Sequence, residues 1–291
     1  TELFSFLSKF MLIKEKRRLI ILIMSILFLL SGCSKDTTLY ITEENGMYTA
    51  SFLAMDTVMS FSIIGINAKA KIQKAYDYIM AFDDTYSAHS QNSEVVKVNA
   101  EASNGILISD NLAQQINTAL KVSIMTNGAF DITVFPLVKL WGFYDGNYTV
   151  PDSGSIEKAI KSIGYEKIKL KDNMLYLEKD TQIDLGAIAK GYAGEKTAQL
   201  LMNLGIKSGM LSLGGNMQIF GLNAYGSKWN IAIQDPNDNN AYIGIIHNTD
   251  CSIITSGSYQ MYFEKDSKKY HHIIDPHTGY PAESGLISVT V

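Results

Sequence analysis

Three of the five histidines in the chain lie within seven residues near the C-terminal end of the sequence. His271 and His272 are adjacent, and His277 follows the turn-forming residues Asp275 and Pro276. Clustered imidazoles can bind a metal ion, and a single imidazole can act as a general base near neutral pH. On a β-strand, however, His271 and His272 point to opposite faces, so one ion cannot bind both without a bulge. The spacing alone therefore leaves three interpretations: a metal site, a base, or a turn whose side chains are satisfied locally.

A second segment that could bind a ligand or take part in a reaction runs from Asp184 to Tyr192. Small residues there lie between a predicted strand and a predicted helix. Backbone N–H groups at the start of a helix can bind phosphate, and Lys190 would add a positive charge. The segment lacks the glycine spacing of a P-loop or of a dinucleotide-binding fingerprint. Close packing of the helix on the strand therefore explains the same residues equally well.

Three further segments combine small residues with polar or aromatic neighbours. Leu213–Asn216 and Thr255–Tyr259 are predicted turns, in which glycine permits a positive φ angle or the close approach of a ligand. Phe130 and Asp131 place an aromatic ring beside a carboxylate directly after a predicted helix. Phe130 fits either the core or a stacking contact with a ligand, so none of these segments decides the function by itself.

The recurrence of apolar residues at helical spacing predicts three helices that would position these segments. Asn67 is a plausible cap for the first, and Gly128 and Gly205 are well placed to end the second and third. The predicted helices span Ala68–Asp83, Ser109–Met125 and Ile188–Leu204.

Short runs of apolar residues, several of them alternating with polar ones, predict β-strands, and the pair Asp172 and Asn173 predicts a hairpin turn. Helices early in the chain and hairpins late in the chain predict an α+β fold with largely antiparallel sheets. The predicted strands span Thr57–Ile64, Lys167–Lys171, Met174–Glu178, Gly209–Leu213, Met217–Phe220, Trp229–Ile233, Tyr242–His247, Tyr259–Glu264 and Lys269–Ile274.

The N-terminal part of the chain has the pattern of a secretory signal. Met11 is followed by four basic residues, then by the apolar run Leu19–Leu30, and then by Ser31, Gly32 and Cys33. This order resembles the lipobox of bacterial lipoproteins, in which the cysteine receives a diacylglycerol. The sequence therefore predicts a signal peptide at residues 1–32, lipidation of Cys33, a polar tether at residues 33–47 and a domain at residues 48–291. An uncleaved membrane anchor is the alternative.

The net charge and the cysteine content limit the possible partners and the possible disulfide bonds of the protein. Residues 1–32 carry a net charge of +3, so the remaining chain carries −7 against −4 for the whole sequence. An acidic domain without a basic stretch argues against nucleic acid as a partner. Once Cys33 is lipidated, Cys251 is the only other cysteine, which rules out an intramolecular disulfide. The predicted location is the cell membrane, facing outside the cytoplasm.

Taken together and in this order, the segments resemble the ApbE family of FAD:protein FMN transferases across most of the chain after the tether. The matching segments are Met55-Asp56-Thr57, Tyr86 with Ser87–Asn99, Gly128–Asp131 through Pro136-Leu137 and Leu140–Phe143, Asp184–Ala193, Leu213–Asn216, Thr255–Gly257 and His272–Gly279.

The resemblance implies an ApbE-like α+β fold, FAD as substrate and Mg²⁺ as metal. It also implies transfer of FMN to a Thr or Ser hydroxyl of an extracytoplasmic acceptor protein, with release of AMP. His272 would be the base for that hydroxyl, and the backbone carbonyl of Ala189 would bind the metal. Lys190 and Asp275 would support the FAD site. By the same resemblance, the residues that line the FAD site are Met55, Tyr86, Ala129, Phe130, Asp131, Gly186, Tyr192 and Ile274.

In the family, the strand that begins at Ser288–Val291 leads into an Asp-Ala-x-x-Thr-like segment with further metal ligands, so the sequence is interpreted as C-terminally truncated. Two other functions fit the same motifs. A metal-dependent FAD pyrophosphatase would use water as acceptor, and a non-catalytic lipoprotein would only bind flavin. The sequence predicts neither the acceptor protein nor the oligomeric state.

Overall fold

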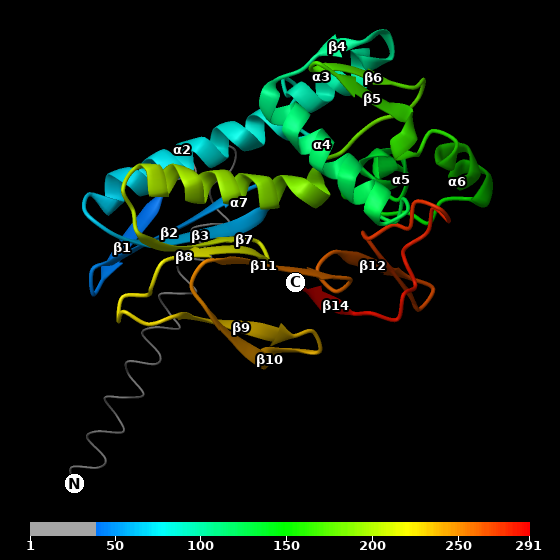
Figure 1. The fold of residues 1–291 in the computed structure, drawn as a ribbon. Helices are drawn as coiled ribbons and strands as arrows, with labels where there is room; N and C mark the ends of the chain where they lie inside the picture. The colour runs from blue at the N-terminus through cyan, green and yellow to red at the C-terminus, as the bar shows by residue number, and fades with distance from the viewer. Residues whose placement is uncertain (1–38) are drawn as a thin grey trace, which may run out of the picture. The chain divides into compact units, whose positions relative to one another are not determined.

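A seven-stranded sheet forms the centre of the protein in a computed structural model, which describes residues 39–291 (Figure 1). The strand order is β1-β2-β3-β7-β8-β11-β14, and every neighbouring pair is antiparallel. The strands span β1 Tyr40–Glu44, β2 Met47–Ala54, β3 Thr57–Ile64, β7 Ser208–Leu213, β8 Asn216–Phe220, β11 Cys251–Gly257 and β14 Ser288–Thr290.

Two tight turns set the register of the sheet. Met55 and Asp56 join β2 to β3 with φ angles of 49° and 57°, and Gly214 and Gly215 join β7 to β8 with φ angles of 60° and 85°. Two successive residues with positive φ match the right-handed twist of the strands they connect. The carboxylate of Asp83 accepts a hydrogen bond from the Met55 N–H at 2.9 Å, which compensates a strained position.

Two long helices, α2 (Ala68–Tyr86) and α7 (Gly186–Asn203), lie side by side over one face of the sheet (Figure 1). Apolar residues of α2 recur every three or four positions, and this stripe is buried in the main core. Glycine in α7 allows close packing: a Cβ at Gly194 would lie 3.0 Å from Cγ of Gln218 in β8. The middle of α7 therefore lies close against the sheet.

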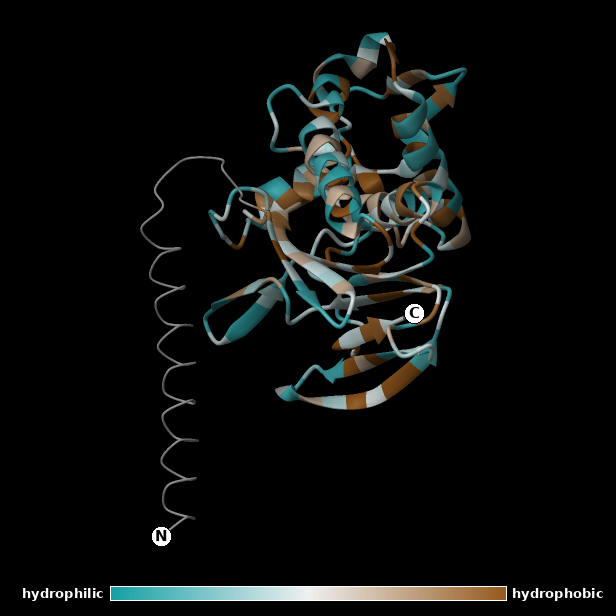
Figure 2. Ribbon diagram, turned by 90° about the vertical axis from the view of Figure 1, so that its left-hand side faces the viewer, coloured by the Kyte–Doolittle hydropathy of each residue, from teal (hydrophilic) through white to brown (hydrophobic). Residues whose placement is uncertain are grey.

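A hairpin of β9 (Trp229–Asp235) and β10 (Asp238–Asn248) packs by its own small core of Ile219, Trp229, Ile231 and Ile253. Apolar stretches of this hairpin and of the central sheet stand out in Figure 2. Ile219 and Ile253 belong to β8 and β11, so this core fixes the hairpin to the central sheet.

A second core lies around Trp141, whose indole N–H donates to the Gly279 carbonyl at 2.8 Å. Phe143, Ile156 and Ile274 are also buried in this core. This second core joins α5 Phe135–Leu140, α6 Ser153–Ile160 and the hairpin of β12 Tyr262–Lys265 and β13 Lys268–His271. The remaining elements pack in the main core: α3 Glu94–Glu101, α4 Asp110–Met125 and the sheet of β4 Ile106–Leu107, β6 Met174–Leu177 and β5 Ile168–Lys171.

The structure confirms the α+β fold and the three predicted helices within a few residues. The tether assignment is wrong for Tyr40–Glu44, which form edge strand β1: their side chains are mostly exposed, as in a linker, but their backbone pairs with β2. Thr255–Gly257, predicted as a turn, belong to β11. The last predicted strand, Lys269–Ile274, ends at His271 in β13.

The predicted signal peptide, Cys33 and the start of the tether lie outside the described residues. Within residues 39–291, no helix has both the length and the apolar character needed to cross a membrane.

Candidate functional site

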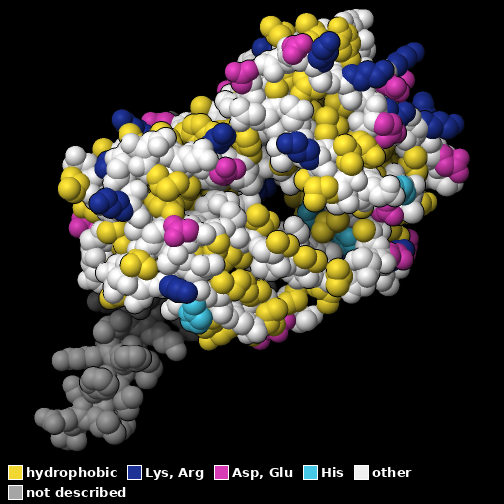
Figure 3. All heavy atoms as spheres, viewed as in Figure 1, with side chains coloured by type: hydrophobic (Ala, Val, Ile, Leu, Met, Phe, Trp, Pro, Cys, Tyr) yellow, Lys and Arg dark blue, Asp and Glu magenta, His cyan; other side chains and the backbone are white. Residues whose placement is uncertain are grey.

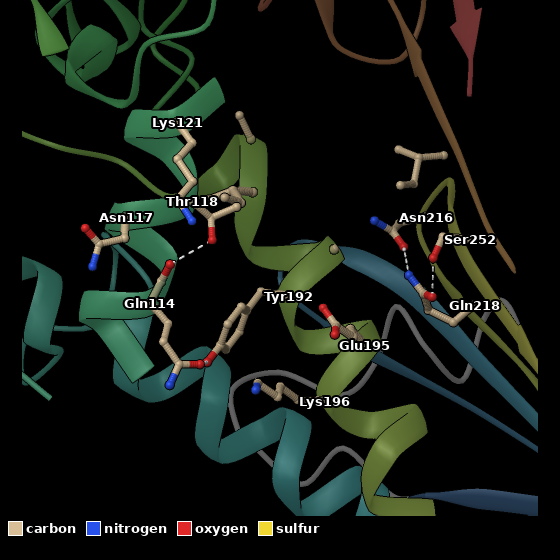
Figure 4. A pocket seen from close by; sticks show the side chains of 14 residues that line it. Gln114, Asn117, Thr118, Lys121, Tyr192, Glu195, Lys196, Asn216, Gln218 and Ser252 are labelled. Carbon is tan, nitrogen blue, oxygen red and sulfur yellow. Dashed lines mark hydrogen bonds between the residues drawn. The ribbon is translucent and has the colours of Figure 1, made fainter. Parts of the chain in front are cut away.

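An open cavity of about 940 Å³ lies along the exposed face of α7, with α4 on one side and the sheet on the other (Figure 4). Most of the residues that line it have polar side chains. Tyr192 points from α7 toward Gln114 of α4, whereas Asn216, Gln218 and Ser252 lie on the sheet side. The residues that line it are Gln114, Asn117, Thr118, Lys121, Ala187, Ile188, Gly191, Tyr192, Glu195, Lys196, Asn216, Gln218, Ser252 and Ile254.

Tyr192, a predicted FAD contact, ties α7 to α4 at this cavity. Its hydroxyl donates to the carboxamide oxygens of Asn111 (3.1 Å) and Gln114 (2.9 Å). Its ring stacks on Phe82 of α2, with centroids 6.1 Å apart. Burial raises the pKa of Tyr192 above its ordinary value, and the neighbouring Tyr86 and Glu195 act in the same direction. The phenol therefore stays protonated and acts as a donor at neutral pH.

A second polar region surrounds Asp184, directly before α7. Burial raises the pKa of the Asp184 carboxyl, while N–H groups at the helix start, His89 and Lys190 counteract that rise. The start of a helix carries a partial positive charge, which favours an anion there. Asp184 and Lys190 thus form a charged region at the first turns of α7. Figure 3 shows a hollow near the middle of this face of the protein, with basic and histidine side chains beside it.

His272, the predicted base, lies near Lys190 at this region. Its Nδ1 is 3.1 Å from the Met261 carbonyl oxygen, which also accepts the His272 backbone N–H. A carbonyl can only accept, so Nδ1 carries the proton and Nε2 carries the lone pair. Burial holds the pKa of His272 below its ordinary value of 6.5. His271 and Lys190 lower this pKa further, whereas the contact with Met261 raises it. The ring is therefore a neutral base at pH 7.

The adjacent residues of the histidine segment have structural partners. Ile274 is buried in the second core, where it pairs with Pro281. Asp275 Oδ1 accepts from the backbone N–H of His277 at 2.9 Å, and His277 Nδ1 lies 3.2 Å from it. Burial alone would raise the pKa of Asp275, but these contacts and the Thr278 hydroxyl hold it below its ordinary value. The turn interpretation is thus confirmed for Asp275.

The predicted contacts after α4 are divided between surface and interior. Ala129 is exposed, and Phe130 is partly buried against the main core. Asp131 is buried, and its Oδ1 accepts from the Thr133 backbone N–H (2.8 Å) and hydroxyl (2.6 Å). Burial raises the pKa of Asp131, whereas the bonds to Thr133 lower it. In the described structure, Asp131 therefore caps the short 3₁₀ helix Ile132–Val134.

Three more predicted contacts lie at the edges of elements. Met55 is in the β2–β3 turn and partly buried. Tyr86 is the last residue of α2, buried, with its ring 4.7 Å from that of Phe82. Gly186 is the first residue of α7. Met55 and Gly186 thus lie at the ends of elements, with the Met55 N–H bonded to Asp83, and little of the Tyr86 ring is exposed.

Ala189, the predicted metal ligand, has its side chain buried in α7 and does not line the cavity, whereas Ala187 does. Residues 39–291 contain no group of three or more His, Cys, Asp or Glu side chains placed to hold a metal ion. Asp184 is the buried carboxylate nearest in sequence to the predicted ligand.

His89 is a residue of this region that sequence reasoning missed. Its Nε2 lies 4.0 Å from Oδ2 of Asp56, and its ring stacks on that of Tyr144. These partners come from three separate segments of the chain, and no local spacing signals their proximity. The buried carboxamide of Gln218 was also missed, because a lone amide in a strand carries no motif, and Asn216 was predicted only as part of the Leu213–Asn216 segment.

Comparisons with known proteins agree with this architecture. Residues 55–291 match the ApbE family. The FAD:protein FMN transferase of Salmonella typhimurium is 35% identical over 278 residues, which cover 91% of this chain and 79% of that protein. The Escherichia coli protein of the same name is 33% identical over 272 residues, covering 89% and 78%.

Solved structures show the same fold. The ApbE protein of Thermotoga maritima superposes with a TM-score of 0.80 at 31% identity and covers 84% of this chain and 81% of its own. The flavin transferase ApbE of Vibrio cholerae gives a TM-score of 0.76 at 29% identity, covering 84% and 82%. Sequence and fold agree over the same region, and the chain therefore belongs to the ApbE family.

Proposed function

We propose that this protein is an FAD:protein FMN transferase that attaches FMN to a Thr or Ser hydroxyl of an acceptor protein. The observation that carries the proposal is His272. Its Nδ1–H is held by the Met261 carbonyl, its Nε2 is left as a base, and burial keeps the ring neutral. Relatives that share the fold and about a third of the sequence are named FAD:protein FMN transferases.

The reaction follows from this arrangement. Nε2 of His272 takes the proton of the acceptor hydroxyl while its oxygen bonds to the phosphorus on the FMN side of the FAD pyrophosphate. The bond from that phosphorus to the bridging oxygen breaks, and AMP leaves with the electron pair. Lys190 would offset the negative charge of the phosphates, and its proximity to His272 and Asp184 supports this role.

Mg²⁺ fits this site as an ion held largely by substrate. Mg²⁺ takes oxygen ligands, commonly one or two carboxylates together with substrate phosphates and water. The residues that would hold it here are Asp184, whose burial disfavours an uncompensated negative charge, and the backbone carbonyl of Ala189. When bound, the ion would neutralise charge that develops on the leaving phosphate.

The location of the enzyme is part of the same proposal. A diacylglycerol on Cys33 would hold it at the membrane, facing outside the cytoplasm. The support is the basic segment, apolar run and small residues that precede Cys33. Its acceptor would then be an extracytoplasmic protein.

The decisive experiment incubates the chain with FAD, Mg²⁺ and an acceptor that carries a Thr, with a Thr→Val acceptor as control. We expect mass spectrometry to show one FMN added per acceptor and an equal amount of AMP, and we expect chelation of the metal to stop both. AMP with only free FMN would identify a pyrophosphatase. FAD recovered unchanged would identify a flavin-binding protein without this activity.

A further inference from the structure

The imidazole of His89 stacks on another ring by one face and is about half exposed to solvent. It lies parallel to the Tyr144 ring, with centroids 4.3 Å apart and an interplanar angle of 6°. The side chain is nevertheless 49% exposed. Because Tyr144 covers one face of the imidazole, the exposed area must include much of the opposite face.

The Tyr144 ring, on which His89 stacks, is fixed by contacts of its own. The Tyr144 hydroxyl donates to the Ala88 carbonyl at 3.0 Å, which ties Tyr144 to the same loop that carries His89. The Phe135 ring packs edge-on against Tyr144 at 5.2 Å and 80°. His89 therefore rests on a support that does not need a ligand to form.

Other contacts of His89 do not explain its position. The distance of 4.0 Å to Asp56 joins two exposed side chains, and an exposed ion pair of this kind contributes little. Within residues 39–291, neither ring nitrogen donates or accepts a hydrogen bond with another protein group; the bond of this residue to Ser87 uses its backbone N–H. The stacking contact thus determines where the imidazole lies.

The open face belongs to the region already described. Asp56, which lies 4.0 Å from His89, follows Met55 in the β2–β3 turn, and His89 is also close enough to Asp184 before α7 to lower the pKa of that carboxyl. An aromatic plane of this kind makes favourable stacked contacts with flat aromatic rings. Of the two flat rings of FAD, the tricyclic isoalloxazine is the larger and gains more than the adenine from stacking on an exposed aromatic plane.

We propose that the open face of His89 stacks on the isoalloxazine ring of FAD and so fixes the flavin end of the substrate. The inference rests on FAD being the substrate, as in the proposed function. It assigns a flavin-contacting role to a residue of the Ser87–Asn99 segment that was not among the predicted FAD contacts. His89 takes no part in the chemical step.

The test is equilibrium binding of FMN, followed by quenching of flavin fluorescence, and of ADP, followed by calorimetry. Stacking of a planar ring on an aromatic side chain predicts FMN binding on the order of tenfold weaker for His89→Ala. Binding of ADP, which shares the other half of FAD, should stay within twofold. His89→Phe keeps the plane and should restore most of the FMN affinity and the quenching.

The matched control is His247→Ala, which removes an exposed histidine of β10 that contacts Asn230. It should bind both ligands like the parent. Unchanged FMN affinity in His89→Ala would overturn the inference, as would a loss for ADP in place of FMN. A His89→Phe protein as weak as His89→Ala would also overturn it, since a plane would then not be what matters.

The two proposals fail in different ways. If the parent protein transfers FMN but His89→Ala binds FMN normally, the stacking inference is wrong and the transferase stands. If FMN binding depends on His89 but no acceptor is modified, the flavin subsite stands and the proposed reaction is wrong. Melting temperatures of His89→Ala and the parent should agree closely, because the imidazole is half exposed and Tyr144 keeps its other contacts.

Discussion

Replacement of Gly279 by alanine tests the turn that follows His272. Gly279 has φ +75°, and its carbonyl accepts the hydrogen bond from the Trp141 indole in the second core. A Cβ built on Gly279 would lie 2.4 Å from Cγ2 of Ile156 and 3.1 Å from Cδ1 of Ile160. The first distance is far inside van der Waals contact, so the turn or the side chains of α6 would have to move.

The expected destabilisation has two parts. A left-handed backbone costs an alanine about 1–2 kcal/mol relative to glycine. Overpacking of a filled core adds about 1–3 kcal/mol. Gly285→Ala measures the backbone cost without the overpacking cost, because Gly285 has φ +77° but no atom lies within 4 Å of a Cβ built on it. Gly279→Ala should therefore lose about 2–5 kcal/mol of unfolding free energy, and Gly285→Ala only the backbone part of about 1–2 kcal/mol.

The measurement is urea unfolding of both variants and the parent, followed by far-ultraviolet circular dichroism and by tryptophan fluorescence. The fluorescence should change more in Gly279→Ala, since Trp141 bonds to that residue. Equal losses in the two variants would refute the reasoning, because the packing of Ile156 against the turn would then contribute nothing. A smaller loss in Gly279→Ala than in Gly285→Ala would refute it more strongly.

Two further predictions concern the reaction and the location. For His272→Ala, FMN transfer should slow by about a hundred- to ten-thousand-fold while FAD binding changes little. His271→Ala, measured in parallel, should keep most of the rate. A loss under tenfold for His272→Ala would contradict the assignment of His272 as the base. Because burial lowers the pKa of His272 below 6.5, the neutral base is present above that pH, so the rate should be flat at pH 7 and fall as the pH drops through the lowered pKa. Cys33→Ala should release the protein from membranes or block its processing, as cell fractionation would show; unchanged cleavage and membrane retention would refute lipidation.

Local sequence predicted much of the fold because some elements depend on residues close to one another. The stripe of Ile72, Ala75 and Ile79 predicts α2 by spacing alone, and Asp172 and Asn173 both adopt positive φ in the predicted hairpin turn. The order of the short motifs also predicted the family. These signals are local because helix periodicity and turn geometry are set within a few residues.

The strands at the sheet edge needed the tertiary structure. Tyr40–Glu44 have the polar composition of a linker, yet they form β1 because backbone groups of any composition can pair with an open edge. Cys251–Gly257 form β11 because β8 and β14 lie on either side of them. Pairing of this kind joins residues far apart in the chain, so no local pattern predicts it.

Some features of the candidate site could likewise be predicted from the sequence, and others depend on the tertiary structure. The sequence by itself determined that His272 and Lys190 occur in motifs that could do chemistry. Only the tertiary structure decided that the Met261 carbonyl fixes the proton of His272 on Nδ1, that Asp131 caps a helix, and that His89 stacks on Tyr144. The physical reason is that tautomer, pKa and ring stacking depend on which groups exclude water from a side chain, and packing between distant segments supplies those groups.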